Sequence, residues 1–206
     1  MLRRYVRADS TYLEIGPGDC ALAIEIARRA RMVYAIDVSR EIAGDINLPR
    51  NLELLLSDGC SIPVPAGSID VAYSDQLMEH LHPDDAAEQL ANIYRALKPG
   101  GVYVCITPNR LSGPHDVSRY FDEVATGFHL QEYIIAELSE MFAQVGFRRL
   151  AVLVGGRGAH LSAPVRLIST VEVLLQKLPS GLEKMMARGL PLRPILGAKI
   201  VGTREK

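Results

Sequence analysis

The sequence predicts an α/β protein built on a doubly wound, mostly parallel seven-stranded sheet with helices on both faces. Short apolar runs alternate along the chain with longer amphipathic stretches, which is the pattern of strands connected through helices. Residues 12–38 form the clearest such unit, with an apolar run, a glycine turn, a helix and a second apolar run. The length of 206 residues, 48% of them hydrophobic, suits a single domain with one sizeable core.

Residues 12–38 have the features of a nucleoside-binding βαβ unit. Leu13 and Ile15 begin a buried strand, which ends at the Gly-Pro-Gly turn of residues 16–18. Glycines there let a ligand approach the backbone, and the following helix presents free N–H groups at its N-terminus. Asp37 ends the second strand, roughly 20 residues after the glycines, where an acid accepts hydrogen bonds from two ribose hydroxyls.

The glycine turn alone leaves the kind of cofactor open. Gly16, Gly18 and Ala21 loosely satisfy the G-x-G-x-x-A pattern of dinucleotide sites, which would indicate a nicotinamide-dependent oxidoreductase. However, the carboxylate of Asp19 would repel a pyrophosphate at this position. Together with Glu14 it suits a ligand that carries a positive charge, such as the ammonium of an amino-acid moiety. A cofactor-binding subunit without turnover is a third alternative, and it stays open.

The other expected elements continue the alternation of strands and helices. Helices are expected to end where Pro and Gly interrupt the periodicity. Between the fifth strand and the next helix, a stretch rich in Pro, Gly and polar residues reads as an ordered insertion or lid. The expected strands are 52–56, 69–73, 102–106, 147–154 and 195–202, the expected helices are 39–46, 84–97, 131–144 and 164–178, and the insertion is 108–130.

Composition excludes several classes of protein. The net charge of −1 gives no general nucleic-acid footprint. Three cysteines without C-x-x-C spacing make a disulfide framework unexpected and favour a reducing, cytoplasmic location. No apolar run approaches the ~20 residues of a membrane span, and no signal peptide is expected, because Met1-Leu-Arg-Arg leads directly into the first strand.

Charge is divided unevenly along the chain. Residues 1–156 hold 14 Lys and Arg against 21 Asp and Glu, whereas residues 157–206 hold 9 against 3. Within a single domain of residues 1–206, we therefore expect a helical, basic and apolar extension at 157–194. Such a surface suits peripheral contact with an anionic membrane or with a phosphorylated lipid-linked acceptor. We favour the alternative, in which 164–178 packs on the sheet or forms a homodimer contact, because the last strand must still return to the sheet.

Several segments together resemble the small-molecule class I S-adenosylmethionine-dependent methyltransferases often labelled type 11. The resemblance covers roughly residues 10–155, and its segments are Glu14-Ile-Gly-Pro-Gly18, Asp37-Val-Ser39, Ser57-Asp58-Gly59, Ser68-Ile-Asp70 with Glu79-His80, and Leu97-Lys-Pro-Gly-Gly101. It implies a Rossmann-like methyltransferase fold, the cofactor S-adenosyl-L-methionine and the product S-adenosyl-L-homocysteine. Cys20 stands where the family commonly has a further glycine, and we expect its small side chain to fit.

The resemblance also implies which residues hold the cofactor. The glycines of the turn would lie against the methionine part, and Asp37 would hold the ribose. The loop that begins at Asp58 would bind the adenine edge, and the backbone after the fourth strand would line the sulfonium. The full set is Glu14, Gly16, Pro17, Gly18, Asp37, Val38, Asp58, Gly59, Cys60, Asp75 and Gln76.

Three histidines are candidates for catalysis, because an imidazole is suited to removing a proton near neutral pH. His80 belongs to the pair that the family places beside the cofactor, and His115 and His129 lie in the polar insertion. The run from His80 through His82 to Asp84 is similar to the H-x-H-x-D pattern of metallohydrolases. Because it lacks the terminal histidine and also reads as an ordinary helix start, no metal is predicted.

Methyl transfer to a small-molecule acceptor is the predicted function. Methyltransferases that act on nucleic-acid amines often carry Asn/Asp-Pro-Pro-Tyr after the fourth strand, whereas this chain has Ser74-Asp-Gln-Leu. No nucleic-acid partner is therefore expected. The insertion is similar to members of the family tied to glycan or surface-lipid pathways, so a glycan or lipid-linked intermediate is a candidate acceptor.

Overall fold

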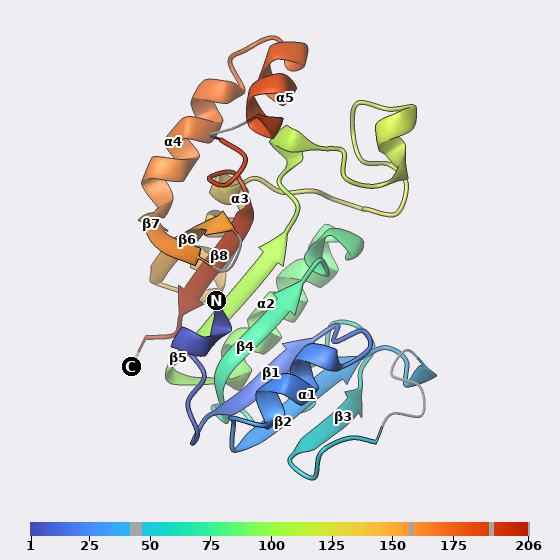
Figure 1. The fold of residues 1–206 in the computed structure, drawn as a ribbon, viewed down its shortest axis with the longest axis vertical. Helices are drawn as coiled ribbons and strands as arrows, with labels where there is room; N and C mark the ends of the chain where they lie inside the picture. Colours follow the sequence, from blue (N-terminus) through green and yellow to red (C-terminus); the bar gives the residue numbers. More distant parts are fainter. Residues whose placement is uncertain (42–46, 157–158, 190–191, 206) are drawn as a thin grey trace.

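An eight-stranded sheet forms the centre of the computed structural model, which describes residues 1–41, 47–156, 159–189 and 192–205 (Figure 1). The strand order is β3-β2-β1-β4-β5-β8-β6-β7. The strands are β1 (Thr11–Ile15), β2 (Met32–Asp37), β3 (Leu52–Leu56), β4 (Ile69–Asp75), β5 (Leu97–Thr107), β6 (Arg149–Gly156), β7 (Ala159–Pro164) and β8 (Ala198–Thr203).

Most neighbouring strands run parallel. β1 pairs in parallel with β2 on one side and with β4 on the other, so the winding reverses between β1 and β4. β3 and β5 extend the parallel part, whereas β8 runs antiparallel between β5 and β6. The predicted doubly wound, mostly parallel sheet is confirmed. Ligands in such sheets bind at the carboxyl ends of the strands beside the switch point.

The predicted count of seven strands is wrong, because β7 adds an eighth strand at the edge of the sheet. It pairs antiparallel with β6, within the stretch that was expected to be helical. Ala159-His-Leu-Ser-Ala-Pro164 has no apolar run of the kind that marks a buried strand, and most of its side chains are exposed. Pairing with β6 therefore makes it a strand, and its terminal proline suits an edge position.

Helices cover both faces of the sheet, as predicted. α1 (Ala21–Ala27) packs on one face through Ala23 and Ile26. The opposite face holds α2 (Pro83–Ala96), α3 (Ile135–Val145) and α4 (Val165–Leu175), whose buried side chains form a second apolar cluster with the strands. α5 (Ser180–Arg188) lies beyond the sheet, beside the insertion (Figure 1).

One predicted helix begins later than expected, and another extends into residues that the structure does not describe. Helix α3 begins at Ile135, not at residue 131, because Tyr133 is extended and bridges to Asn109. For the predicted helix 39–46, residues 42–46 lie outside the described residues. Short 3₁₀ turns occur at Leu2–Arg4, Met78–His80, Arg110–Ser112 and Val117–Tyr120.

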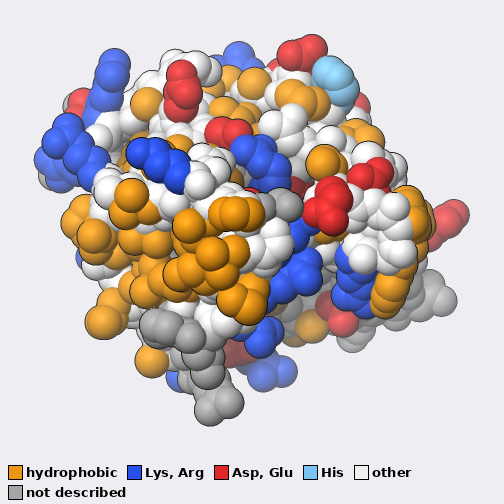
Figure 2. Space-filling model, turned by 90° about the horizontal axis from the view of Figure 1, so that it is seen from above, with side chains coloured by type: hydrophobic (Ala, Val, Ile, Leu, Met, Phe, Trp, Pro, Cys, Tyr) orange, Lys and Arg blue, Asp and Glu red, His pale blue; other side chains and the backbone are white. Residues whose placement is uncertain are grey.

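The tail packs on the body through one buried acid and a few apolar side chains. Ile168 and Leu175 of α4 are buried, as the favoured interpretation of 164–178 requires. Glu172, on the same helix, is fully buried and accepts hydrogen bonds from the backbone N–H groups of Ile135 (2.9 Å) and Ala136 (3.2 Å) at the start of α3. Other apolar side chains remain exposed, and Figure 2 shows a broad apolar surface on the end that carries α4 and α5. Among the described residues, no helix is long and apolar enough to cross a membrane.

Candidate active site

A narrow cavity of about 90 Å³ lies at the carboxyl ends of β1 and β2, beside the switch point. It brings together four of the sequence-predicted cofactor residues, Gly16, Asp37, Val38 and Gly59. The remaining lining residues are Ile15, Ile36, Ser57, Ser61, Leu77, Leu81 and Gln89. Glu14, Pro17, Gly18, Asp58, Cys60, Asp75 and Gln76 do not line this cavity.

The turn after β1 is shaped for close approach of a ligand. Gly16 and Gly18 have φ angles of 68° and 53°, in the left-handed region that favours glycine. The N–H of Gly16 donates to the carbonyl of Ile36 (2.9 Å), which ties the turn to β2. A Cβ on Gly16 would lie 3.2 Å from the Leu77 side chain, and one on Gly18 would meet nothing within 4 Å. The backbone is therefore uncovered at Gly18, whereas the Leu77 side chain lies against Gly16.

Cys20 fits where the family commonly has glycine, and it adopts a glycine-like conformation. Its φ is 58°, and the side chain is fully buried at the start of α1. Burial raises the pKa of its thiol. Cys20 is therefore a structural residue with an unreactive thiol.

Glu14 places a buried carboxyl group at the end of β1. Its side chain is nearly inaccessible, and Oε2 has no hydrogen-bond partner among the described residues. Burial, with smaller contributions from the neighbouring Asp75 and Asp19, raises the pKa of Glu14 to about 8. A buried acid without a partner is costly unless a cation or a donor reaches it. This orphaned oxygen suits the ammonium that the sequence predicts at this position.

Asp37 and Val38 lie at the tip of β2. Oδ1 of Asp37 accepts a hydrogen bond from the N–H of Ser39 (3.2 Å), which fixes the carboxylate at the rim of the cavity. Val38 is 63% exposed, and a Cβ on Gly59 would lie 3.6 Å from it. An exposed apolar side chain in this position can cover a flat ring.

The loop after β3 is ordered by Asp58 itself. Its exposed carboxylate accepts hydrogen bonds from the N–H groups of Cys60 (2.9 Å) and Ser61 (2.7 Å), and these bonds lower the pKa of Asp58 to about 2. Asp58 thus shapes the loop that presents Gly59 to the cavity.

Gln89 on α2 is a cavity residue that sequence reasoning missed. Its Nε2 donates to the carbonyl of Gly59 (2.5 Å), while its Oε1 is buried and has no partner among the residues that the structure describes. Such an acceptor is suited to the exocyclic amine of an adenine. No sequence signal singles it out, because a glutamine inside an amphipathic helix normally faces solvent.

Asp75 ends β4, Gln76 follows it, and both are exposed. Oδ2 of Asp75 accepts a hydrogen bond from the Tyr73 hydroxyl (2.9 Å). Gln76 has a φ of 53°, and its N–H donates to the carbonyl of Ile106 (2.9 Å). The chain therefore turns sharply just before Leu77, which reaches the cavity.

Two of the three candidate histidines, His115 and His129, are joined by the buried carboxylate of Glu132. Nδ1 of His129 lies 2.8 Å from Oε1 of Glu132, and Nδ1 of His115 lies 3.1 Å from Oε2. Burial acts to raise the pKa of Glu132, but the hydrogen bonds from His115 and His129 outweigh it and lower the pKa. Since a carboxylate only accepts, both Nδ1 atoms carry protons, and each neutral ring keeps an Nε2 lone pair. The ring of His80 packs edge-on against that of His129, with centroids 5.0 Å apart.

Glu79 adds a second buried acid beside His80 and His129. It is fully buried, with Oε2 accepting from the Thr107 hydroxyl (2.8 Å) and Oε1 unpartnered. Burial raises its pKa. Ligand atoms of Glu79, His80 and His129 all lie within 4.8 Å of one another, so the three could hold a metal ion, although the sequence predicted none. His82 instead caps α2, where its Nδ1 accepts from the N–H of Asp84 (3.4 Å).

Comparison with known proteins identifies the class. The family model described as a methyltransferase domain matches residues 13–105. An S-adenosylmethionine-dependent methyltransferase of Mycolicibacterium smegmatis is 33% identical over 156 residues, which cover 73% of this chain and 58% of the relative. A wheat (Triticum aestivum) phosphoethanolamine N-methyltransferase is 30% identical over 103 residues, covering 46% of this chain and 20% of the relative.

A solved structure agrees over the whole chain. A Haloferax volcanii methyltransferase, in complex with its activator, superposes with a TM-score of 0.69 at 20% identity, covering 100% of this chain and 87% of the other. This structure shows the same fold, and the family model together with the sequence relatives identifies residues 13–105 as a class I S-adenosylmethionine-dependent methyltransferase domain, whose cofactor is S-adenosylmethionine. It spans about half the length of the curated relatives it matches.

Proposed function

We propose that this protein transfers a methyl group from S-adenosylmethionine to a small-molecule acceptor, with a glycan or lipid-linked intermediate as the candidate class. The observation that carries the proposal is the position of His129. Its buried imidazole is held by Glu132 and packs against His80. His80 in turn lies in the chain between Leu77 and Leu81, which line the cofactor cavity. The name of the wheat relative, a phosphoethanolamine N-methyltransferase, supports a small acceptor. The three free cysteines support the predicted cytoplasmic location.

The residues present fit the cofactor. Glu14 would pair with its ammonium, and the turn at Gly16 and Gly18, which is uncovered at Gly18, would lie against the methionine part. Asp37 would accept the ribose hydroxyls, while Val38 and Gln89 would cover and recognise the adenine. The backbone at Asp75 and Gln76 would line the reacting centre. When bound, S-adenosylmethionine supplies a methyl group on a sulfonium.

The histidines would accept and stabilise the proton that the acceptor loses. Glu132 fixes His129 with its proton on Nδ1, so that Nε2 is free to accept a proton. A hydroxyl acceptor would lose its proton as the bond to the methyl group forms, and an ammonium acceptor would lose one before its nitrogen attacks. The same carboxylate stabilises the imidazolium that results, which is the logic of an oriented catalytic base. His80 would border the acceptor on the cofactor side, and His115 would do so on the far side. Positioning of the two reactants supplies much of the rate in such a displacement.

Two measurements test the proposal. Calorimetry with S-adenosylhomocysteine and with NAD should show binding of the former alone; tight binding of NAD without S-adenosylhomocysteine would instead identify an oxidoreductase. Turnover of the methyl donor should then be screened over fractionated metabolites, with the product identified by mass spectrometry. His129→Gln should keep S-adenosylhomocysteine affinity and lose turnover by about 10²–10⁴-fold, the range for a general base. Cofactor binding without any methylated product would favour a non-catalytic subunit.

A further inference from the structure

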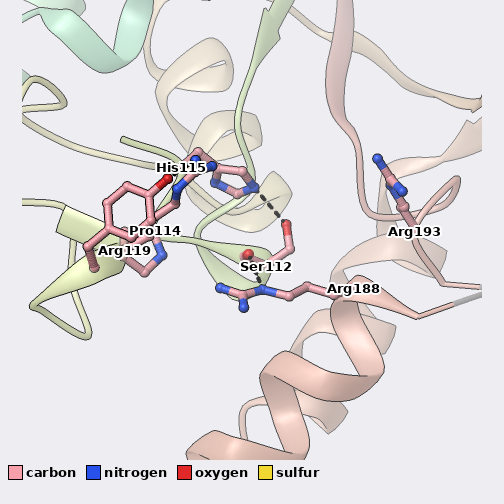
Figure 3. Close-up of a pocket in the computed structure, with 7 residues that line it drawn as sticks. Ser112, Pro114, His115, Arg119, Arg188 and Arg193 are labelled. Carbon is pink, nitrogen blue, oxygen red and sulfur yellow. Dashed lines mark hydrogen bonds between the residues drawn. The ribbon is translucent and has the colours of Figure 1, made fainter. Parts of the chain in front are cut away.

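A second cavity lies outside the strand ends, between the insertion and the tail. It has a volume of about 500 Å³, within the range of roughly 300–1,000 Å³ that holds small molecules. Ser112, His115 and Arg119 come from the insertion, and Arg188 and Arg193 come from the tail (Figure 3). Pro114 and Tyr120 complete the lining.

The charge of this cavity is positive and uncompensated. Arg119, Arg188 and Arg193 form no ion pair with any carboxylate of the described residues, and no acid lines the cavity. Arg188 is fixed by donating from Nε to the carbonyl of Ser112 (2.9 Å) and from Nη2 to that of Gly113 (2.9 Å), which leaves further N–H groups for a ligand. Arg119 stacks over the Tyr120 ring, 4.6 Å from its centroid. Guanidinium groups that line one cavity without carboxylates are suited to an anion with several oxygens.

The basic cavity is joined to the proposed reaction centre by a chain of side chains. His115 lines the cavity and bonds to Glu132, which bonds in turn to His129, and His129 packs on His80. His80 lies between Leu77 and Leu81, which line the cofactor cavity. These contacts couple the two sites, so an acceptor anchored by its anionic group at the arginines would lie on the His115 side of the proposed reaction centre.

We propose that this cavity binds a phosphate group of the methyl acceptor, with Arg119, Arg188 and Arg193 as its ligands. This inference rests on the proposed function and narrows its substrate to phosphate-bearing acceptors. A phosphorylated soluble metabolite and a lipid phosphate headgroup share this chemistry. On the face shown in Figure 2, basic side chains lie beside a broad apolar surface, and Met185, 65% exposed, is on the same helix as Arg188. The experiment below therefore distinguishes a soluble phosphorylated acceptor from a lipid phosphate headgroup.

The test uses the full chain saturated with S-adenosylhomocysteine, with inorganic phosphate as the probe, followed by calorimetry. The variant is Arg119→Gln with Arg193→Gln, because neither side chain bonds to a backbone carbonyl as Arg188 does. Arg166→Gln is the matched control, since this arginine is exposed on α4 and does not line the cavity. The double variant should weaken phosphate binding by about tenfold or more, as expected for loss of charged hydrogen bonds. Arg166→Gln should leave it unchanged.

A second arm separates the two sources of phosphate. Flotation with phosphatidylcholine vesicles, with and without phosphatidic acid, should show binding that depends on phosphatidic acid and on the two arginines if the source is a lipid. Phosphate binding without vesicle binding supports a soluble acceptor. Normal S-adenosylhomocysteine binding with no phosphate or phosphatidic acid binding, or with binding that the double variant leaves intact, would overturn the inference while leaving the proposed function standing. Failure to bind S-adenosylhomocysteine would instead count against the proposed function.

Discussion

Glu14 offers a direct test of how the cofactor's amino-acid end is held. Burial raises the pKa of Glu14 to about 8, so at pH 7 roughly nine-tenths of the free protein carries a proton there. An ammonium placed against the orphaned Oε2 favours the carboxylate and displaces that proton. Binding of S-adenosylhomocysteine at pH 7 should therefore release about 0.9 proton per protein molecule.

Calorimetry in buffers of low and high ionisation enthalpy, such as PIPES and imidazole, measures this release as the slope of the observed enthalpy against the buffer's ionisation enthalpy. Glu14→Gln keeps the shape of the side chain and removes the titrating group, so its slope should fall close to zero. The control also subtracts any proton exchanged by the ligand's own amine. Equal slopes for the two proteins would show that Glu14 does not meet the ammonium.

The same group makes the ligand-free protein's stability depend on pH. Its pKa is near 4.5 in the unfolded chain and about 8 in the folded protein, so the folded state holds the extra proton between these values. The contribution of Glu14 to the free energy of unfolding is fully present below pH 4.5 and is lost as the pH rises toward 8. The free energy of unfolding of Glu14→Gln, measured by denaturant titration, should fall less than that of the wild type over this range.

Three further predictions concern other carboxylates. Asp37→Ala should weaken S-adenosylhomocysteine binding by roughly 1–3 kcal/mol, the cost of leaving ribose hydroxyls unpaired; unchanged affinity by calorimetry would remove Asp37 from the site. Glu172→Ala should lower the free energy of unfolding by about 3 kcal/mol, because the buried N–H groups of Ile135 and Ala136 lose their acceptor, whereas the control Glu183→Ala should change it by less than about 0.5 kcal/mol. Incubation with EDTA should leave turnover unchanged, as the absence of a metal motif in the sequence predicts; a loss restored by added Zn²⁺ would identify Glu79, His80 and His129 as metal ligands.

The strand ends could be predicted because each is marked by local sequence. The turn at Gly16 and the acid at Asp37 follow directly from short apolar runs, and parallel pairing then brings the carboxyl ends of those runs to one edge. The fit of Cys20 could also be predicted from local sequence, because a small side chain in the left-handed conformation still allows the helix to start there. These features depend on residues close together in the chain, so one sequence was enough to place them.

The parts that sequence reasoning missed depend on contacts between distant residues. Gln89 reaches Gly59 from another element, and Glu172 caps a helix that begins 37 residues before it. β7 has no apolar pattern of its own and becomes a strand through pairing with β6. In each case a side chain or strand that looks solvent-facing in the sequence is fixed by a partner that only the tertiary fold supplies.

These distant contacts also explain why the insertion and the tail act as one unit. Glu172 holds α4 to the start of α3, where Glu137 forms a salt bridge with Arg110 (2.6 Å) at the base of the insertion. The following residues reach Ser112 and Gly113, whose carbonyls accept from Arg188 on α5. A buried acid is costly unless its hydrogen bonds are satisfied, and Glu172 meets that condition only while α4 stays docked. The fold therefore couples docking of the tail to the shape of the basic cavity, which makes the tail a wall of the proposed acceptor site and gives its excess of positive charge a role inside the molecule.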